Sequence, residues 1–389
     1  MARPLTVLQL LPALDAGGVE RSTLEIAAAL TAAGHRALVI SQGGRLLPAL
    51  LATGAEHIAL PIGRKSLLTL RLIPTLRRLL REVDADIVHA RSRLPAWLAL
   101  WALRGGSPGR RRTPHFVTSV HGLNSPGRYS SVMTRGERVI CVSDTVRAYL
   151  LRHYPDLDPA RLAVIPRGVD AAEFPCGFTP DPAWRARFAS EFPQLATGRL
   201  LLLPGRGTRL KGHAHALRLL VELRASGVDA RLLLAGAEQA GRARYLAELR
   251  AQIAAAGLQP YVAITPPRAD MRELYAVSEL VLQLSEQPES FGRTVLEAFA
   301  SGRPLLGWDH GGVGELLHAL DPAGAVPLGD AALLLARAHE LLRPAAAMPG
   351  PAAPIAPALP DRYTLARMQH DTLALYASLV EHDAHLAHD

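Results

Sequence analysis

The sequence predicts an α/β protein built from two doubly wound domains, each a parallel sheet covered by helices on both faces. Short apolar runs alternate with longer segments of helical periodicity along most of the chain, the pattern expected of buried parallel strands and crossover helices. The alternation lapses near residues 171–195, a stretch rich in Pro, Phe and Asp that we interpret as a linker, and then restarts. The length of 389 residues fits two domains, each large enough to bury its own core.

The first domain is expected at residues 1–178. Its predicted strands are Leu5–Leu11, Ala37–Ser41, Asp86–His89, Phe116–Val120, Arg138–Val142 and Leu162–Ile165. Helical spacing over Val19–Ala33 follows the first of them. Since strand and helix alternate in this way, the strands are expected to be parallel.

The second domain is expected at residues 195–360, before a last segment at 361–389. Its predicted strands are Leu200–Pro204, Arg231–Ala235, Val262–Thr265, Leu280–Leu284 and Pro304–Gly307. Its predicted helices are His213–Ala225, one that ends at Ala255 and one after Phe291. The Pro- and Ala-rich stretch 344–360 is expected to be extended coil. The amphipathic pattern at Thr364–Val380 lies far from the last strand, so this helix is expected to cross back to the first domain.

Composition narrows the class of protein. Two cysteines, Cys141 and Cys176, exclude a disulfide framework and a structural zinc site, which favours a reducing cytoplasm. No apolar run reaches the ~18 residues that a membrane span needs. Residues 1–178 contain 23 Arg and Lys against 13 Asp and Glu (+10), whereas the remainder contains 20 against 22 (−2). The basic half suits an anionic partner: a membrane surface, a phosphorylated glycolipid or nucleic acid. Aromatic residues at 5% make nucleic acid the weakest of the three.

The strongest motif, PESFGRTVLE, runs from Pro288 to Glu297 and opens a helix after the strand Leu280–Leu284. Free backbone N–H groups at a helix N-terminus suit a phosphate. Glu289 and Glu297 are eight residues apart, roughly 12 Å along a helix axis, so they can bind hydroxyls at opposite ends of one ligand. Alternatively, Glu289 caps the helix and Glu297 is a solvated surface residue.

A second motif, GRGTRLKG, covers residues 205–212 between a predicted strand and a helix. Its glycines offer backbone N–H groups, and Arg206 and Lys211 offer positive charge for a diphosphate. It matches neither the G-x-G-x-x-G fingerprint nor the P-loop. Lys211 is one of only two lysines in an arginine-rich chain, which favours a selected role for its compact ammonium.

In the first domain, Gly17 and Gly18 form a glycine turn after the first strand, and His121 follows the strand Phe116–Val120. Each has an ordinary structural alternative, a plain strand–helix turn and a structural histidine. Four basic residues are candidates for contact with an acceptor phosphate, although a solvated basic face explains them equally well. These are Arg64, Lys65, Arg91 and Arg93.

With these residues in view, the sequence resembles a family 4 glycosyltransferase of the GT-B fold along essentially the whole chain. The E-x7-E motif together with G-R-x4-K-G is the specific part of the resemblance. The other matching segments are GGVE at 17–20, HG at 121–122, VS at 142–143, IPRGVD at 165–170 and DHGG with Glu315 at 309–315. Arg167 stands where many relatives have Asn. Less specifically, the chain resembles enzymes that build the lipopolysaccharide core or O-antigen.

The resemblance implies a role for each motif residue. Arg206 and Lys211 would hold the pyrophosphate of a nucleotide-diphosphate sugar, and Glu297 would bind its ribose hydroxyls. Glu289 would contact the donor sugar beside His121. The remaining donor-binding residues would be Gly17 and Gly18, which approach the phosphate and the acceptor, and Phe291, Gly292, Arg293 and Thr294.

The expected activity is transfer of a hexosyl unit with retention of configuration. The donor would be UDP- or GDP-linked, and no metal or other cofactor is expected. The D-x-D patterns at Asp84/Asp86 and Asp156/Asp158 are interpreted as surface carboxylates. The acceptor would be a phosphorylated glycolipid or glycan of bacterial surface polysaccharide synthesis. The protein would then work in the cytoplasm with peripheral contact to the inner membrane. Alternatives are a GT-B nucleotide-sugar epimerase or hydrolase, and a non-catalytic nucleotide-sugar binding protein.

Overall fold

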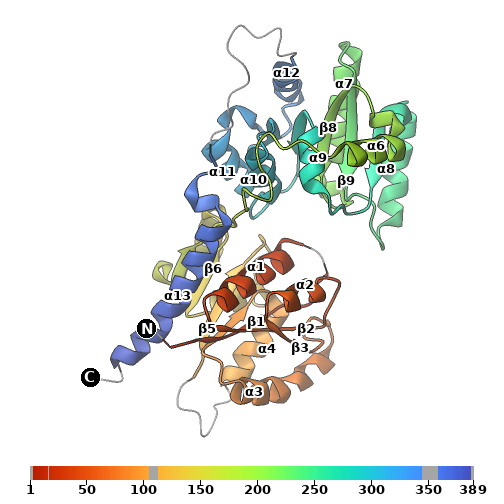
Figure 1. Cartoon of the computed structure of the whole chain (residues 1–389). Helices are drawn as coiled ribbons and strands as arrows, with labels where there is room; N and C mark the ends of the chain where they lie inside the picture. Colours follow the sequence, from red (N-terminus) through yellow and green to blue (C-terminus); the bar gives the residue numbers. More distant parts are fainter. Residues whose placement is uncertain (1–2, 16, 105–112, 344–357, 387–389) are drawn as a thin grey trace. The chain divides into compact units, whose positions relative to one another are not determined.

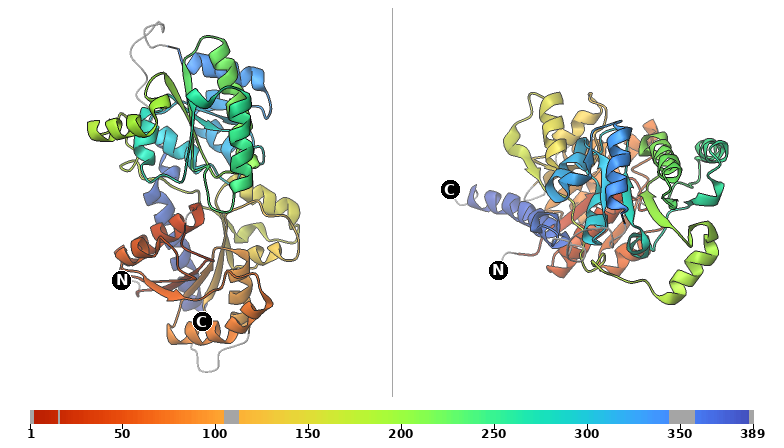
Figure 2. Two further views of the ribbon diagram at one scale, coloured as in Figure 1. Left: turned by 90° about the vertical axis from the view of Figure 1, so that its right-hand side faces the viewer. Right: turned by 90° about the horizontal axis from the view of Figure 1, so that it is seen from above.

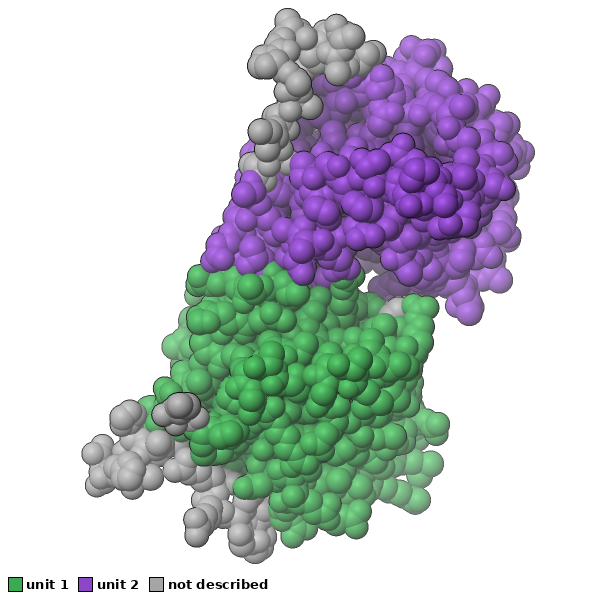
Figure 3. Space-filling view, viewed as in Figure 1, with its two compact units in different colours: residues 1–168, 365–389 green, residues 169–364 purple. Residues whose placement is uncertain are grey.

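The computed structural model describes residues 3–15, 17–104, 113–343 and 358–386 (Figure 1). The chain forms two compact units, residues 1–168 with 365–389, and residues 169–364 (Figure 3). Of the predicted extended stretch 344–360, residues 344–357 lie outside the described part of the chain.

The first unit contains a seven-stranded parallel sheet with the strand order β3-β2-β1-β4-β5-β6-β7. The strands are β1 Thr6–Leu10, β2 Arg36–Ser41, β3 Glu56–Ala59, β4 Ile87–Ala90, β5 His115–Val120, β6 Arg138–Cys141 and β7 Leu162–Val164. The helices are α1 Gly18–Ala32, α2 Leu47–Ala52, α3 Leu72–Glu82, α4 Arg93–Arg104, α5 Asp144–His153 and α13 Leu365–Leu386. Short 3-10 helices are η1 Leu67–Arg71, η2 Ser130–Thr134 and η3 Pro159–Arg161.

The C-terminal helix α13 belongs to the first unit, as the sequence predicts. Met368, Leu375 and Tyr376 are buried in the same core cluster as Ile26 and residues of the central strands. The side chain of Gln369 donates to the carbonyl of Glu25 over 2.9 Å, which joins α13 to α1. In Figures 1 and 2 the helix, drawn in blue, runs alongside the first unit.

The second unit contains a six-stranded parallel sheet with the order β10-β9-β8-β11-β12-β13. The strands are β8 Arg199–Pro204, β9 Ala230–Ala235, β10 Val262–Thr265, β11 Leu280–Gln283, β12 Leu305–Trp308 and β13 Ala325–Val326. The helices are α6 Pro182–Glu191, α7 His213–Ala225, α8 Ala243–Ala255, α9 Met271–Val277, α10 Arg293–Ala300, α11 Gly311–Leu320 and α12 Ala331–Leu341. The 3-10 helices are η4 Pro193–Leu195, η5 Arg209–Lys211, η6 Gln259–Tyr261, η7 Pro322–Gly324 and η9 Asp361–Tyr363.

The segment 171–195 is not a plain linker, because it contains α6 and belongs to the second unit. The Asp181 side chain caps this helix by accepting from the N–H of Ala183, and Pro182 occupies its first turn, where no N–H is needed. The indole of Trp184 stacks on Phe188 and donates to a carboxylate oxygen of Asp270 over 2.9 Å. The two units meet in sequence at 168/169, ten residues before the predicted end of the first domain at 178.

Both sheets reverse their strand order at one point, between β1 and β4 in the first unit and between β8 and β11 in the second. In doubly wound sheets, loops that leave the carboxyl ends of the strands at such a point diverge and open a ligand-binding crevice. The predicted motifs therefore lie where the topology favours a site. None of the helices in the described ranges combines the length and apolar character required to traverse a bilayer.

Candidate active site

Two loops of the second unit lie side by side at its switch point. One follows β8 and the other follows β11, and the backbone N–H of Glu286 donates to the carbonyl of Leu210 over 2.9 Å. Gly212 has a φ of 74°, and a Cβ placed there would lie 1.8 Å from the carbonyl oxygen of Leu284. Only glycine allows the two loops to approach this closely.

The two loops bring Lys211 and Glu289 into contact. The Lys211 ammonium donates to Glu289 Oε1 over 2.5 Å, and the two side chains are only 20% and 27% exposed. The Ser285 hydroxyl donates to the same carboxylate oxygen. His310 Nε2 in turn donates to the Ser285 carbonyl over 2.7 Å. Glu289 is therefore held at the base of the loop and does not cap the helix that follows.

The two arginines of the glycine-rich turn have different surroundings. Arg209 pairs with Glu248 of α8, and its guanidinium lies 5.8 Å from the ring centroid of Tyr245. Arg206 is exposed, and no partner for its guanidinium occurs among the described residues. Arg206 is therefore available to a ligand phosphate, whereas Lys211 would have to exchange its contact with Glu289 for one with that phosphate.

Glu297, on α10, is not a solvated surface residue. It is 8% exposed, and its carboxylate accepts from the Tyr275 hydroxyl over 2.8 Å and from Arg293 Nε over 2.9 Å. Burial, followed by the nearby Glu297 carboxylate, raises the pKa of Tyr275 well above its usual value, so its hydroxyl stays protonated as a donor. Thr294 also hydrogen-bonds to Tyr275. A carboxylate has about four acceptor positions, so Glu297 retains capacity for ligand hydroxyls.

The helix α10 begins directly after Phe291 and Gly292, which are both buried. The N–H of Gly312, in the first turn of α11, donates to the carbonyl of Glu289 over 2.7 Å. A Cβ on Gly312 would lie 2.6 Å from the backbone of Phe291. The glycine pair of the DHGG segment therefore lets α11 press against the loop that carries Glu289.

In the first unit, Arg167 joins the glycine turn to His121. Its guanidinium donates to the carbonyl of Gly18 and to His121 Nδ1, the latter over 2.8 Å. Gly17 precedes the helix with a φ of 145°, a conformation that favours glycine. Since arginine can only donate, Nδ1 must accept, and the ring proton is carried on Nε2. Burial, and then the charges of Arg167 and Arg91, hold the pKa of His121 well below its usual range. His121 is therefore a neutral imidazole whose tautomer is determined by Arg167.

A buried polar network supports this position. His89 contacts the Tyr376 hydroxyl through Nδ1 and the Ser119 hydroxyl through Nε2, each over 2.6 Å. Arg91, 4% exposed, donates to the Ser22 hydroxyl over 2.9 Å. Burial raises the pKa of Tyr376 to about 12. Through Tyr376, the C-terminal helix contributes a polar contact to the core beneath the site.

The four basic acceptor candidates do not form one patch. Arg91 and Arg93 line a cavity of about 300 Å³ together with Glu20, His121 and other residues at the strand ends of the first unit. Arg64 and Lys65 are exposed in the segment before η1. Arg91 is therefore no part of a solvated basic face.

The sequence did not single out Ser285, Tyr275 or Tyr376. Ser285 has a local signal, because it lies directly after a strand and four residues before Glu289. The two tyrosines have none, since their partners are 22 and 287 residues away. Within the described ranges, no three His, Cys, Asp or Glu side chains are grouped as metal ligands.

Family models match both halves of the chain. The model for "Glycosyltransferase Family 4" matches residues 16–173, and that for "Glycosyl transferases group 1" matches residues 187–343. Among curated proteins, the phosphatidyl-myo-inositol mannosyltransferase of Mycobacterium leprae is 25% identical over 343 residues, covering 84% of each chain. The D-inositol 3-phosphate glycosyltransferase of Kineococcus radiotolerans is 30% identical over 218 residues, which is 54% of this chain. The chain spans 47% of that protein and 44% of its Corynebacterium kroppenstedtii counterpart.

Solved structures agree with this assignment. A glycosyltransferase from Rickettsia africae superposes with a TM-score of 0.79 at 25% identity, over 97% of this chain and 99% of that one. Anabaena HepE, in complex with UDP and glucose, has a TM-score of 0.80 at 19% identity, over 96% and 100%. WaaG, a glycosyltransferase involved in lipopolysaccharide biosynthesis, has a TM-score of 0.64 at 20% identity, over 98% and 99%. With two Rossmann-like units and a match to both models, the chain belongs to the family 4 glycosyltransferases of the GT-B fold.

Proposed function

We propose that the protein transfers a hexose from a UDP- or GDP-linked donor to a phosphorylated glycolipid or glycan, with retention of configuration and without a metal. The observation that carries this proposal is the contact between Lys211 and Glu289, in the same motif as the buried carboxylate of Glu297. The loops and the helix α10 at the β8/β11 switch point thus offer the Lys211 ammonium to a diphosphate, and the Glu289 and Glu297 carboxylates to ligand hydroxyls.

Each group has one task in this scheme. Arg206 and Lys211 bind the diphosphate, and Glu297 accepts from the ribose hydroxyls. Glu289 accepts from hydroxyls of the donor sugar. In the first unit, neutral His121 donates from Nε2 to a substrate oxygen. The N–H groups at the start of α10 add their dipole to the phosphate site.

The chemical step is an exchange of two bonds at the anomeric carbon. The bond to the diphosphate oxygen breaks as Arg206, Lys211 and the helix N-terminus stabilise the charge that develops on the leaving group. The acceptor hydroxyl attacks the same face of the oxocarbenium-like centre and passes its proton to the departing phosphate oxygen. The motifs contain no residue with an evident nucleophilic role, so no glycosyl-enzyme intermediate is invoked.

Two observations support an anionic acceptor. The first 178 residues carry a net charge of +10. The names of several relatives specify acceptors that bear anionic groups: D-inositol 3-phosphate, phosphatidyl-myo-inositol and L-malate. The structural neighbour WaaG is involved in lipopolysaccharide biosynthesis. The synthesis of bacterial surface polysaccharides supplies anionic acceptors of this kind. The enzyme would meet them at the cytoplasmic face of the inner membrane through peripheral contact.

The test begins with thermal shift of the purified chain against UDP, GDP, ADP and CMP, with and without EDTA. A ligand at 100-fold its Kd stabilises the folded state by ~2.7 kcal/mol. Selective stabilisation by UDP or GDP that EDTA does not reduce is expected. Lys211→Met should abolish most of this shift, whereas Arg209→Gln, a matched change on the same turn, should preserve it.

Turnover of the preferred donor then separates the candidate activities. Transfer to an acceptor supports the proposal. Release of free sugar to water or epimerised nucleotide sugar would favour the hydrolase or epimerase, and tight binding without turnover would favour a binding protein. Equal shifts in Lys211→Met and wild type would refute the site.

A further inference from the structure

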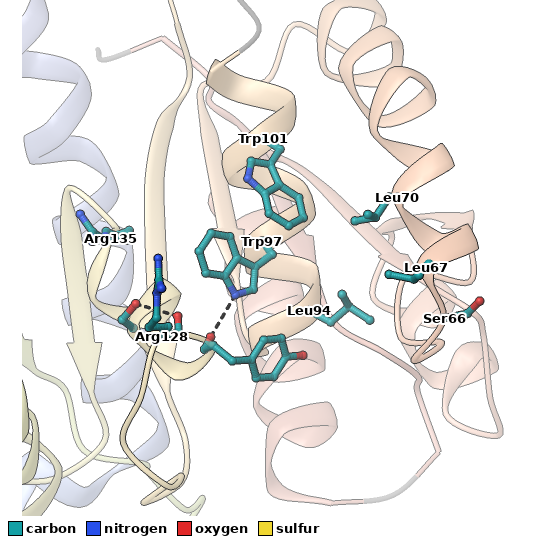
Figure 4. Close-up of a pocket in the computed structure, with 10 residues that line it drawn as sticks. Ser66, Leu67, Leu70, Leu94, Trp97, Trp101, Arg128 and Arg135 are labelled. Carbon is teal, nitrogen blue, oxygen red and sulfur yellow. Dashed lines mark hydrogen bonds between the residues drawn. The ribbon is translucent and has the colours of Figure 1, made fainter.

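The first unit contains a second, larger hollow that no motif accounts for. It measures about 580 Å³ and lies between η1, α4 and the segment 128–135 (Figure 4). Its wall is apolar, formed by Leu67, Leu70, Leu94, Trp97 and Trp101. This volume is within the range of small-molecule sites, which are also mostly apolar.

The tryptophans are held in place before any ligand arrives. The indole N–H of Trp97 donates to the carbonyl of Tyr129 over 3.0 Å, and the Trp97 and Trp101 rings lie 5.0 Å apart. With its polar atom satisfied, Trp97 presents apolar ring surface to the groove, as Figure 4 shows. A rigid aromatic wall loses little conformational entropy when a ligand covers it.

Several residues that line the groove leave apolar surface in water. Leu67 is 86% exposed, Leu70 is 39% exposed and Tyr129 is 47% exposed. Large exposed apolar surfaces that adjoin a concave site mark places where another apolar group binds. An alkyl or prenyl chain laid between Leu67 and the tryptophans would cover all three.

The rim of the groove is positively charged. Arg128 and Arg135 line it, and no Asp or Glu is among the described residues that do. Arg64 and Lys65 immediately precede Ser66, which also lines it. This charge favours an occupant that bears an anionic group next to its apolar chain.

Arg93 connects this groove to the cavity that contains His121. It lines the smaller cavity, its guanidinium lies 5.1 Å from the ring centroid of Tyr129, and it donates to the Ser130 hydroxyl over 3.1 Å. Arg93 and Trp101 are eight residues apart on α4, about 12 Å along the helix. An alkyl chain bound in the groove would therefore begin next to the cavity that contains His121.

We propose that this groove binds the apolar chain of the acceptor, an anionic amphiphile whose hydroxyl end enters the His121 cavity. The proposal rests on the proposed glycosyl transfer for the role of that hydroxyl. The groove binds one amphiphile molecule, with Arg128 and Arg135 at its anionic group and the two tryptophans along its chain.

The test is a fluorescence titration of the full chain with monododecyl phosphate below its critical micelle concentration. Binding should change the emission of Trp97 and Trp101, whereas inorganic phosphate should not. Covering an exposed leucine is worth on the order of tenfold in affinity or more. We therefore expect Leu67→Asn to weaken binding at least about tenfold. Leu51→Asn, at a position 50% exposed on α2, should leave it unchanged.

A second pair of measurements tests the charge. Arg128→Gln with Arg135→Gln should weaken dodecyl phosphate but not the uncharged dodecyl maltoside. Equal effects of Leu67→Asn and Leu51→Asn would overturn the assignment. A membrane-binding surface would replace the assignment if the monomeric amphiphile does not bind, whereas vesicles of phosphatidylglycerol and phosphatidylcholine bind the wild type and not Leu67→Asn. A dimer interface would replace it if the wild type is a dimer that Leu67→Asn dissociates. Nucleotide binding is an independent control: if the wild-type chain binds neither UDP nor GDP, the proposed function is refuted while the groove assignment stands.

Discussion

Replacing Arg167 with Gln tests the contact that determines the state of His121. The guanidinium donates to the Gly18 carbonyl and to His121 Nδ1. A glutamine is shorter and uncharged, so it cannot satisfy both acceptors. The imidazole then distributes its proton between Nδ1 and Nε2, and the Nε2–H donor is present only part of the time.

The expected loss follows from these two contacts. A hydrogen bond to a charged donor contributes about 1.5–3 kcal/mol, and part of that is lost even if the amide retains one partner. We expect kcat/KM to fall about 10- to 100-fold. Two-dimensional ¹H–¹⁵N spectra that resolve the imidazole nitrogens should show the Nε2–H tautomer in the wild type and a mixture in the variant. Arg167→Lys should recover part of the activity, because an ammonium still donates.

The pH dependence of stability provides a second readout. His121 faces Arg167, Arg91 and His89, and its pKa is well below the usual value of about 6.5 in the folded chain. Below pH ~6.5 the unfolded chain takes up a proton that the folded chain does not, so stability falls as the pH drops from there toward the folded pKa. Removing Arg167 lets that pKa rise, which should flatten the fall in Tm between about pH 7 and 5.

Arg152→Gln, a change at an exposed position on α5, serves as the control for this experiment. It should leave the tautomer, the kinetics and the pH profile unchanged. If Arg167→Gln keeps kcat/KM within twofold of wild type and retains the Nε2–H tautomer, Arg167 has no part in positioning His121.

Four further changes test other parts of the site and fold. Glu289→Gln should strengthen UDP binding, because a negative charge near the diphosphate is removed, while it slows transfer; weaker UDP binding would contradict this. Glu297→Gln should weaken UDP about tenfold in the same thermal-shift assay, with kcat nearly unchanged at saturation. Tyr376→Phe should lower the free energy of unfolding in urea by ~1–3 kcal/mol, and an unchanged midpoint would show that its buried hydroxyl is energetically idle. Gly212→Ala should disrupt donor binding, whereas Gly257→Ala, also at positive φ but with nothing within 4 Å, should cost only the backbone strain.

Most of the fold could be predicted because its strands are continuous apolar runs. The exceptions are β3 and β13, which contain four and two residues. The residues of β3 are half-buried or exposed because it lies at the edge of the sheet, so its sequence has no apolar run. The sequence does not predict α6, because a Pro-rich stretch is typical of a loop, although Pro182 lies in the first turn of this helix behind a capping Asp.

The motifs predict which residues form the candidate site, but the partners that these residues have in the structure could not be predicted. The spacing of Glu289 and Glu297 indicates two separate carboxylates, and the structure gives them different surroundings. Glu289 contacts an ammonium 78 residues away, and Glu297 is held by Tyr275, 22 residues away. Such pairings depend on which strands are neighbours in the sheet, and strand order is not encoded in local periodicity. Arg167 was visible only as a departure from its relatives.

In the proposed donor site, the contact between Lys211 and Glu289 would favour the complete nucleotide sugar over a bare nucleoside diphosphate. Both side chains are partly exposed, so their ion pair contributes little to stability and costs little to separate. A bare diphosphate takes the ammonium and leaves the Glu289 carboxylate facing another anion, with only Ser285 as a donor from the loop. A diphosphate that carries a sugar supplies hydroxyl donors to that carboxylate, so both members of the pair regain partners of the right kind. On the proposed assignment, the sugar hydroxyls would replace the hydrogen-bond donor that Glu289 loses when Lys211 binds the phosphate. The nucleotide would then be released more easily once the sugar has been transferred.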